Sequence, residues 1–284
     1  MLFNFDGPLH ALPAGALVRE LPTGSPQYFV EWKPSHTTPS MTVYAEGRKT
    51  RPASARSGTV VAFGDPVYAK KEAATLDAEQ EFLLRSGNTL NPLPATRREV
   101  GAIAKLFGPN AVTYLGDAAT ESRATFVDRS ARYVHFAVHG VLNEYLPLNS
   151  ALAFSTPAAA GVGDNGLLQA WEVFEKMRID ADLVTLSACE SGLGKVIAGE
   201  GLVGLTRAFL FAGARTVNAS LWKVADGPTA DLMTHFYRNL RRGDSKDEAL
   251  RQAQIAVMKM GRRDRIDYSS PAHWAAFVLT GDWK

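Results

Sequence analysis

A single cysteine stands where a short apolar run ends. Cys189 is the only cysteine in the 284-residue chain, and it closely follows the apolar residues of the segment 182–188. Such a run is typical of a strand buried on both faces, and open α/β sheets bind ligands at the carboxyl ends of such strands. The position favours a reactive thiol. The alternative is a small buried hydrophobic residue, which is what most free cysteines are.

A histidine that could activate this thiol follows a second predicted strand. Residues 133–138 read as that strand, and His139 and Gly140 come directly after it. The carboxyl ends of parallel strands lie on one edge of a sheet, so His139 and Cys189 can meet there. An imidazole that takes the proton of a thiol makes it a nucleophile. The N–H groups of Gly140 and Cys189 could hold an oxyanion, since glycine allows close approach.

Other chemistries fit the sequence poorly. His135 and His139 lie about 13 Å apart on an extended strand, too far to share a metal ion. Residues 161–166 match G-x-G-x-x-G but follow a loop, and Glu200 stands where a phosphate loop needs lysine. The serine hydrolase pattern G-x-S-x-G is absent from the sequence. We therefore expect neither a metal nor a cofactor.

The composition is that of an ordinary globular protein, with 46% hydrophobic and 21% charged residues. The 31 basic and 29 acidic residues leave a net charge of +2, which gives no sign of direct nucleic-acid binding. No apolar run approaches the ~18 residues of a membrane span, and the N-terminus lacks a signal peptide. One cysteine excludes an internal disulfide. We expect a cytoplasmic protein that does not bind a membrane.

Strand and helix patterns alternate from residue 59 onward, which predicts an α/β fold with a mainly parallel sheet. Thr96 and Glu99 have the spacing of a capping box for a helix over 96–107. Strands are expected at 59–63, 112–115, 133–138, 151–154, 182–188, 215–222 and 273–279. Helices are expected at 96–107, 120–128, 167–177, 202–212, 226–240 and 245–260.

The N-terminal part follows a different pattern. Asp6-Gly7 is a hairpin signal, and residues 28–32 read as a strand. The strand that this hairpin pairs with would need residues before Met1, so we expect the chain to come from a longer polypeptide. Residues 47–58 read as a loop or linker. We interpret residues 1–57 as a hairpin, strand and linker segment that is the truncated start of the domain formed by residues 58–284.

Several segments together resemble the CHAT domain family. This is a bacterial, caspase-like group in the clan of cysteine peptidases that also holds separase, legumain and gingipain. The resemblance extends over nearly the whole chain, including residues 93–97 and Glu99 upstream of the histidine. Its main segments are His-Phe-Ala-Val-His-Gly at 135–140, Leu-Ser-Ala-Cys-Glu-Ser-Gly at 186–192, the glycine-flanked stretch 199–213, and Ala-Ser-Leu-Trp-Lys-Val at 219–224.

The resemblance implies a caspase-like α/β fold, with a mainly parallel central sheet and helices on both faces. It implies a cysteine endopeptidase that cuts protein substrates with a His139/Cys189 dyad. Two alternatives remain open. One is a non-catalytic, caspase-like module that binds a protein without cutting it, and the other is a different acyl transfer on the same dyad.

Residues 220–223 resemble the strand beside the caspase substrate cleft, which pairs with an extended peptide. Ser220, Trp222 and Lys223 are therefore candidate substrate contacts, although core packing is an equal explanation for Trp222. Asp226 is a further candidate for contact with a basic substrate residue. Its alternative role is the N-cap of the following helix.

Ser187 and Glu190 flank the cysteine and complete the candidate substrate-binding set. Ser187 stands two residues before Cys189, where caspases carry glutamine and legumain glutamate, so neither specificity can be transferred. CHAT domains commonly follow tetratricopeptide or other repeats. The resemblance therefore implies a regulatory region of that kind, in the same chain or in a partner chain.

Overall fold

The computed structural model of the protein describes residues 1–22, 24, 26–50, 58–68, 90–156, 164–187, 200–222, 224–263 and 266–284. Its centre is an eight-stranded sheet in the order β1-β4-β15-β12-β11-β7-β5-β6. Neighbouring strands run parallel except at the β12–β15 pair, which is antiparallel. The strands are β1 (Leu2–Phe3), β4 (His36–Thr37), β5 (Val60–Gly64), β6 (Ala111–Leu115), β7 (Tyr133–Ala137), β11 (Leu183–Leu186), β12 (Thr216–Ser220) and β15 (Phe277–Gly281).

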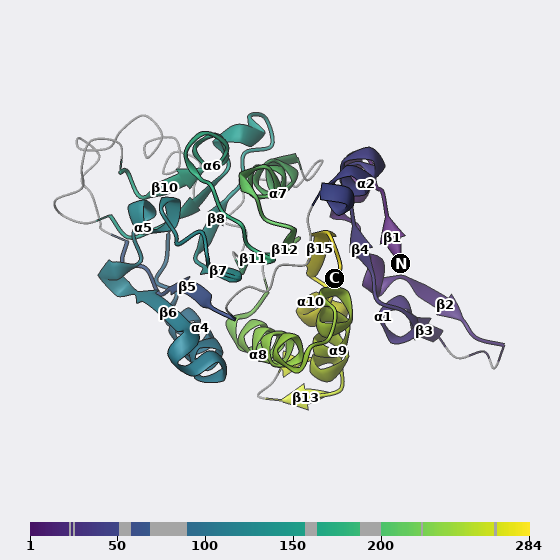
Figure 1. Ribbon diagram of the computed structural model, residues 1–284. Helices are drawn as coiled ribbons and strands as arrows, with labels where there is room; N and C mark the ends of the chain where they lie inside the picture. Colours follow the sequence, from purple (N-terminus) through teal and green to yellow (C-terminus); the bar gives the residue numbers. More distant parts are fainter. Residues whose placement is uncertain are drawn as a thin grey trace.

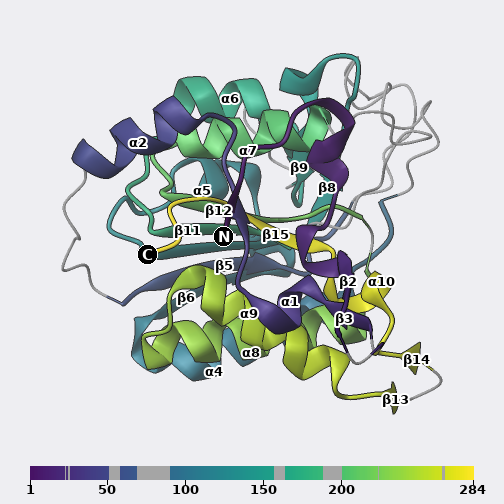
Figure 2. The ribbon, with the colours of Figure 1, turned by 90° about the vertical axis from the view of Figure 1, so that its right-hand side faces the viewer.

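Helices cover both faces of this sheet (Figures 1 and 2). One face carries α2 (Met41–Thr50), α5 (Glu121–Thr125), α6 (Ala170–Lys176) and α7 (Glu200–Ala212). The other carries α1 (Phe29–Trp32), α4 (Pro94–Phe107), α8 (Asp226–Arg242), α9 (Lys246–Met258) and α10 (Pro271–Trp274). A parallel sheet needs this cover because its strands are apolar on both sides. The predicted fold class is confirmed.

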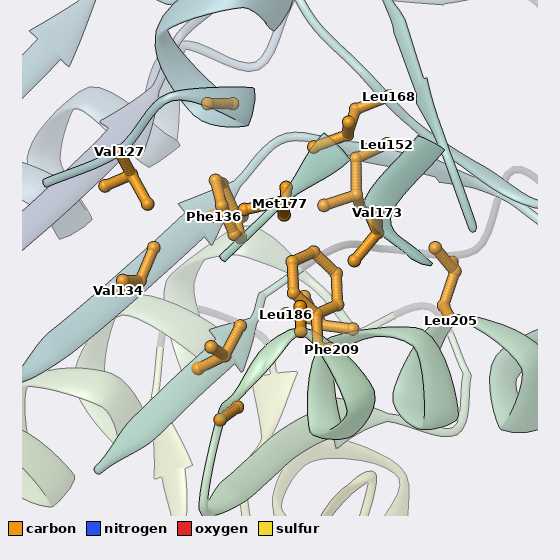
Figure 3. Close-up of a cluster of buried hydrophobic side chains, with 14 of the residues drawn as sticks. Val127, Val134, Phe136, Leu152, Leu168, Val173, Met177, Leu186, Leu205 and Phe209 are labelled. Atoms are coloured by element: carbon orange, nitrogen blue, oxygen red, sulfur yellow. The ribbon is translucent and has the colours of Figure 1, made fainter. Parts of the chain in front are cut away.

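Each face of the sheet has its own hydrophobic core. Phe136 of β7 and Leu186 of β11 pack with Phe209 of α7 in the first core, shown in Figure 3. Tyr237 of α8 and Trp274 of α10, both fully buried, lie in the second. The two cores hold the central strands at fixed positions, and with them the carboxyl ends that carry the candidate site.

Smaller sheets extend from the central one. The strands β8 (His139–Val141), β9 (Ala151–Ala153) and β10 (Leu167–Gln169) form an antiparallel three-stranded sheet. Two pairs complete the set, β2 (Val18–Glu20) with β3 (Pro26–Tyr28) and β13 (Arg262–Arg263) with β14 (Ile266–Asp267). Because β8 starts directly after β7, His139 lies where the chain leaves the central sheet.

Three predictions of local structure are wrong. Residues 29–32 form helix α1 rather than a strand, and Asp6-Gly7 opens the 3₁₀ helix η1 (Gly7–Ala11) rather than a hairpin. The last strand is β15, which begins at Phe277 and follows helix α10. Arg251 of α9 donates to the carbonyl oxygens of Val30 and Glu31 at 2.7 and 2.8 Å. These tertiary contacts with α1 outweigh the strand propensity of its aromatic residues.

The predicted capping box is also wrong. Helix α4 begins at Pro94, so Thr96 and Glu99 lie inside it. Thr96 Oγ1 donates to Leu93 O and accepts the N–H of Asp65, whereas Glu99 pairs with His135. Neither side chain therefore takes part in a reciprocal capping box: Thr96 joins the N-cap carbonyl to Asp65, and Glu99 binds another element. Among the described residues, no helix has the length and apolar character that crossing a membrane requires.

Candidate active site

The candidate site residues that the structure describes lie on one edge of the central sheet. Phe136 of β7 is in register with Leu186 of β11, which is in register with Ala219 of β12. Ser187 and Ser220 come directly after these paired residues on two neighbouring strands. His139 follows β7, so the structure brings it to the same carboxyl edge, and all three side chains are at most 5% exposed.

Part of the predicted site falls outside the described residues. Cys189, Glu190 and Lys223 are in that part of the chain. Asp226 is the first residue of α8, and Ala225 occupies the N-cap position predicted for it. Gly140 is described, and it pairs with Leu152 in the β8–β9 ladder.

A backbone carbonyl orients the ring of His139. The Nε2 atom of His139 lies 2.8 Å from the carbonyl oxygen of Asn91, just before α4. A carbonyl oxygen only accepts hydrogen bonds, so Nε2 carries a proton. In the neutral ring Nδ1 is then the nitrogen with the lone pair. Sequence analysis identifies no residue that orients His139, and in the structure the carbonyl of Asn91 binds its ring.

Tyr68 fixes the backbone of His139. The N–H of His139 donates to Tyr68 Oη at 3.3 Å, and Tyr68 Oη donates to Ala153 O of β9 at 3.2 Å. The two rings lie with centroids 5.3 Å apart. Burial raises the pKa of Tyr68 well above its usual value, so the phenol keeps its proton and remains a donor. Tyr68 was not a sequence candidate, because a tyrosine after a strand has no distinguishing pattern.

Asp65, just after β5, is bonded to the first turns of α4. Asp65 adopts a left-handed backbone conformation (φ 48°), and its N–H donates to Thr96 Oγ1 at 2.7 Å. Its carboxylate accepts from Nε of Arg97 at 2.6 Å. These bonds join the end of β5 to the first turn of α4. The carbonyl of Asn91, three residues before that helix, is thereby held near the sheet edge.

The two serines at the sheet edge differ in their partners. Ser220 Oγ donates to the carbonyl of Trp222 at 2.6 Å, and Trp222 Nε1 donates to Ala272 O at 2.9 Å. Trp222 also packs against the core beneath α8, which favours the packing explanation for this residue. Ser187 Oγ, in contrast, is buried with no hydrogen-bond partner in the described part of the chain.

A chain of buried polar side chains lies beneath Ser187. His135 Nε2 is 2.9 Å from Glu99 Oε1, and His135 Nδ1 is 3.1 Å from the hydroxyl of Tyr237. Tyr237 in turn donates to Thr185 Oγ1 at 3.0 Å. His135 and Thr185 are partners in register, so the network joins β7 and β11 to α4 and α8. In the described residues, no three His, Cys, Asp or Glu side chains are grouped as a metal site.

Comparison with known proteins assigns the family. The model of the CHAT domain matches residues 1–282, and the chain therefore belongs to the CHAT domain family. It is 30% identical over 264 residues to tetratricopeptide repeat protein 28 of Mus musculus, which covers 82% of this chain. The protein of the same name from Homo sapiens is 29% identical over 219 residues, covering 67% of this chain. The alignments span only 10% and 8% of these relatives.

Solved structures of peptidases share the fold. The Arg-specific cysteine proteinase gingipain R matches 88% of this chain and 54% of its own, with a TM-score of 0.50 and 8% identity. Separase of Saccharomyces cerevisiae, in its complex with securin, matches 87% of this chain and 14% of its own, with a TM-score of 0.52 and 13% identity. At these identities the likeness concerns the fold alone, and it is the caspase-like fold expected from the sequence.

Proposed function

We propose that the chain is a cysteine endopeptidase that uses His139 and Cys189. The observation that carries this proposal is the placement of His139. It is buried at the carboxyl edge, with Nε2 bound to Asn91 O and its N–H bound to Tyr68. Cys189 is two residues beyond Ser187, and two residues span at most about 7 Å. The proposed nucleophile is thus tied to the edge where the proposed base lies.

The held ring sets the direction of proton transfer. With the proton on Nε2, Nδ1 of neutral His139 accepts the proton of the Cys189 thiol, and the thiolate attacks the peptide carbonyl carbon. The N–H groups of Gly140 and Cys189 hold the negative oxygen of the tetrahedral intermediate. His139 then returns the proton to the leaving amine, which leaves an acyl-enzyme. A water that gives its proton to Nδ1 then attacks this thioester; the carbon–sulfur bond breaks, the acid leaves, and the Cys189 thiolate takes the proton back from Nδ1.

Substrate contacts and regulation follow the same proposal. The end of β12 receives an extended peptide beside Ser220, with Lys223, Glu190 and Asp226 as further contacts. The curated relatives are named for tetratricopeptide repeats, which supports a repeat region as the regulatory partner. We also propose that residues 1–57 belong to the same domain as residues 58–284, because β1 and β4 pair into its sheet.

The test compares Cys189→Ala and His139→Ala with the wild type in a peptide-library cleavage assay. Both variants should lose cleavage by at least about a thousandfold, as removal of a dyad member does in other peptidases. His235→Ala serves as the matched control, since His235 lies within α8 and away from the carboxyl edge. Cleavage that survives both dyad substitutions contradicts the proposal.

The reactivity of the thiol separates the enzyme from a non-catalytic binding module. Cys189 is the only cysteine, so alkylation of the whole chain reports on this residue alone. Stoichiometric alkylation at mildly acidic pH, lost in His139→Ala, indicates an activated thiol. A thiol that reacts only above its free pKa indicates the binding module.

A further inference from the structure

The segment that connects β8 to β9, residues 142–150, is held in shape by its own hydrogen bonds. Asn143 Oδ1 accepts two backbone N–H groups of the turn that follows it, at 3.1 and 2.8 Å. The N–H of Asn143 donates to Ser150 Oγ at 2.9 Å, and the side chain of Ser150 is fully buried. These bonds tie the two ends of the segment together, directly after the strand that begins with His139.

Helix α7 packs very closely against this segment. A Cβ added to Gly201 would lie 3.0 Å from Ser150 Oγ, and one added to Gly204 would lie 2.8 Å from the carbonyl oxygen of Pro147. Both glycines are buried. Because the atom met at Gly204 belongs to the backbone, a larger residue there would push the helix away from the segment. The segment and the start of α7 therefore form one packed unit.

A carboxylate fastens the two parts of this unit to each other. Glu144 Oε1 accepts the N–H of Gly201 in the first turn of α7, at 3.3 Å. The first N–H groups of a helix have no acceptor within the helix, and a negative charge beside them interacts favourably with the helix dipole. Glu144 is half-buried, so water competes less for this bond than at an exposed position.

The two parts of the unit adjoin the two members of the proposed dyad. Residues 142–150 follow His139 and Gly140 through β8, whereas Cys189 precedes α7, which begins at Glu200. Proton transfer between a thiol and an imidazole requires hydrogen-bond distance, so a displacement of about 1 Å between their supports is enough to impair it.

We propose that Glu144 is a positioning residue of the peptidase. Its hydrogen bond to Gly201 keeps α7, and the chain that leads into it from Cys189, in place relative to His139. The proposal rests on the peptidase function proposed above. Glu144 itself touches neither the thiol nor the substrate in this scheme, and it acts only through the seating of α7 on residues 142–150.

The hydrogen bond and the charge of Glu144 predict opposite effects on the thiol. A carboxylate repels a nearby thiolate, so removal of the charge alone would make Cys189 reactive at lower pH. Loss of position separates the thiol from the imidazole, which makes Cys189 reactive only at higher pH. The direction of the change in Glu144→Ala therefore distinguishes positioning from electrostatics.

The test measures the rate at which iodoacetamide alkylates Cys189 in the full chain between pH 5 and pH 10. Cys189 is the only cysteine, so the loss of free thiol reports on this residue alone. In the wild type, the rate should reach half of its maximum at mildly acidic pH, and this should depend on His139. Glu144→Ala should raise that midpoint by at least about one pH unit. Since the rate follows the thiolate fraction, alkylation at pH 5 should fall about tenfold.

Two control variants accompany Glu144→Ala. Glu144→Gln keeps an acceptor oxygen for the N–H of Gly201 and removes only the charge, so it should not raise the midpoint. Glu31→Ala is the matched control, because the half-buried Glu31 accepts the N–H of Tyr28 at 2.9 Å where α1 begins, on the other face of the sheet (Figure 2). It loses the same kind of bond at another helix and should keep the wild-type midpoint.

Four results would overturn the proposal. An unchanged or lowered midpoint in Glu144→Ala, or an equal rise in Glu144→Gln, refutes positioning by the hydrogen bond and leaves the peptidase function in place. A rise in Glu31→Ala shows that a general loss of stability moves the midpoint. If alkylation of the wild type at mildly acidic pH does not depend on His139, the peptidase function fails, and the positioning role fails with it.

Discussion

The Nε2 atom of His139 and the carbonyl oxygen of Asn91 lie 2.8 Å apart across 48 positions of sequence. This hydrogen bond joins the start of β8 to the segment before α4, and it assigns the proton to Nε2. Tyr68 holds the same histidine through its backbone N–H. The ring and the main chain of His139 thus have separate supports, and substitution of Tyr68 removes only the second.

Tyr68→Phe removes the support of the main chain. The ring stays in place, while the acceptor for His139 N–H and the donor to Ala153 O are lost. A hydrogen bond of about 1 kcal/mol predicts a fall in kcat of about five- to tenfold. KM should change little, because Tyr68 supports the base rather than the peptide. Steady-state kinetics test this, with Tyr114→Phe on the edge strand β6 as the control. A rise in KM at constant kcat would show that Tyr68 acts on substrate binding instead.

Tyr237→Phe removes the centre of the buried network. His135 Nδ1 and Thr185 Oγ1 both lose their partner in a fully buried position. Leaving such groups unsatisfied should lower the free energy of unfolding by about 1–3 kcal/mol. Urea denaturation measures the change, and Tyr145→Phe is the control, since Tyr145 is 90% exposed. Equal stability of the two variants would mean that the network does not stabilise the fold.

Glu121 should make the stability depend on pH. Burial, followed by repulsion from Glu172 and Asp164, raises the pKa of Glu121 from 4.5 to about 7. The folded state therefore binds more protons than the unfolded state between these values, so stability falls as pH rises through this window. The loss should reach on the order of 2–3 kcal/mol at pH 8.

The variant Glu121→Gln tests this pH dependence. Its amide oxygen can still accept the N–H groups of Gly166 and Leu167, which Glu121 binds at 2.8 and 3.1 Å. Denaturation at pH 5 and pH 8 should show a smaller decline than in the wild type. The exposed Glu175 provides the control Glu175→Gln, which should keep the full decline. An identical decline in both variants would exclude Glu121 as the cause.

Gly213→Ala should prevent normal folding. Gly213 ends helix α7 with a φ of 121°, and a Cβ there would overlap the carbonyl oxygen of Ile179. The variant should lose several kcal/mol, or fail to yield soluble protein. Gly101→Ala in α4 is the counterpart, because no atom lies within 4 Å of its added Cβ. It should gain about 0.5–1 kcal/mol. A thermal melt that shows equal shifts for both would contradict the steric explanation.

The central sheet could be predicted because its strands are marked by local apolar runs. Residues 182–188 were predicted as a strand, and β11 covers Leu183–Leu186. The supports of His139 could not be predicted in this way. The group on Asn91 that binds the ring is a backbone carbonyl, which every residue carries, so no residue type signals it.

Glu99 shows how a local pattern can mislead. Thr96 and Glu99 have the spacing of a capping box, yet Glu99 binds His135, 36 positions away. The Thr-x-x-Glu spacing would be the same in a capping box and inside the helix. Only the tertiary fold determines which group Glu99 binds. The same holds for residues 29–32, where the contacts of α1 with α9 outweigh a strand-like composition.

The pairing of Thr37 with Thr280 has a consequence for the order of folding. These residues are 243 positions apart, and their hydroxyl oxygens lie 2.8 Å from each other. During synthesis on the ribosome, β4 has no partner on this side until β15 emerges. Closing so long a loop is slow, so the pairing of β4 with β15 should form after the pairing of the central strands β5, β7, β11 and β12. A newly made chain would therefore complete the sheet beyond β12 only after β15 has been translated.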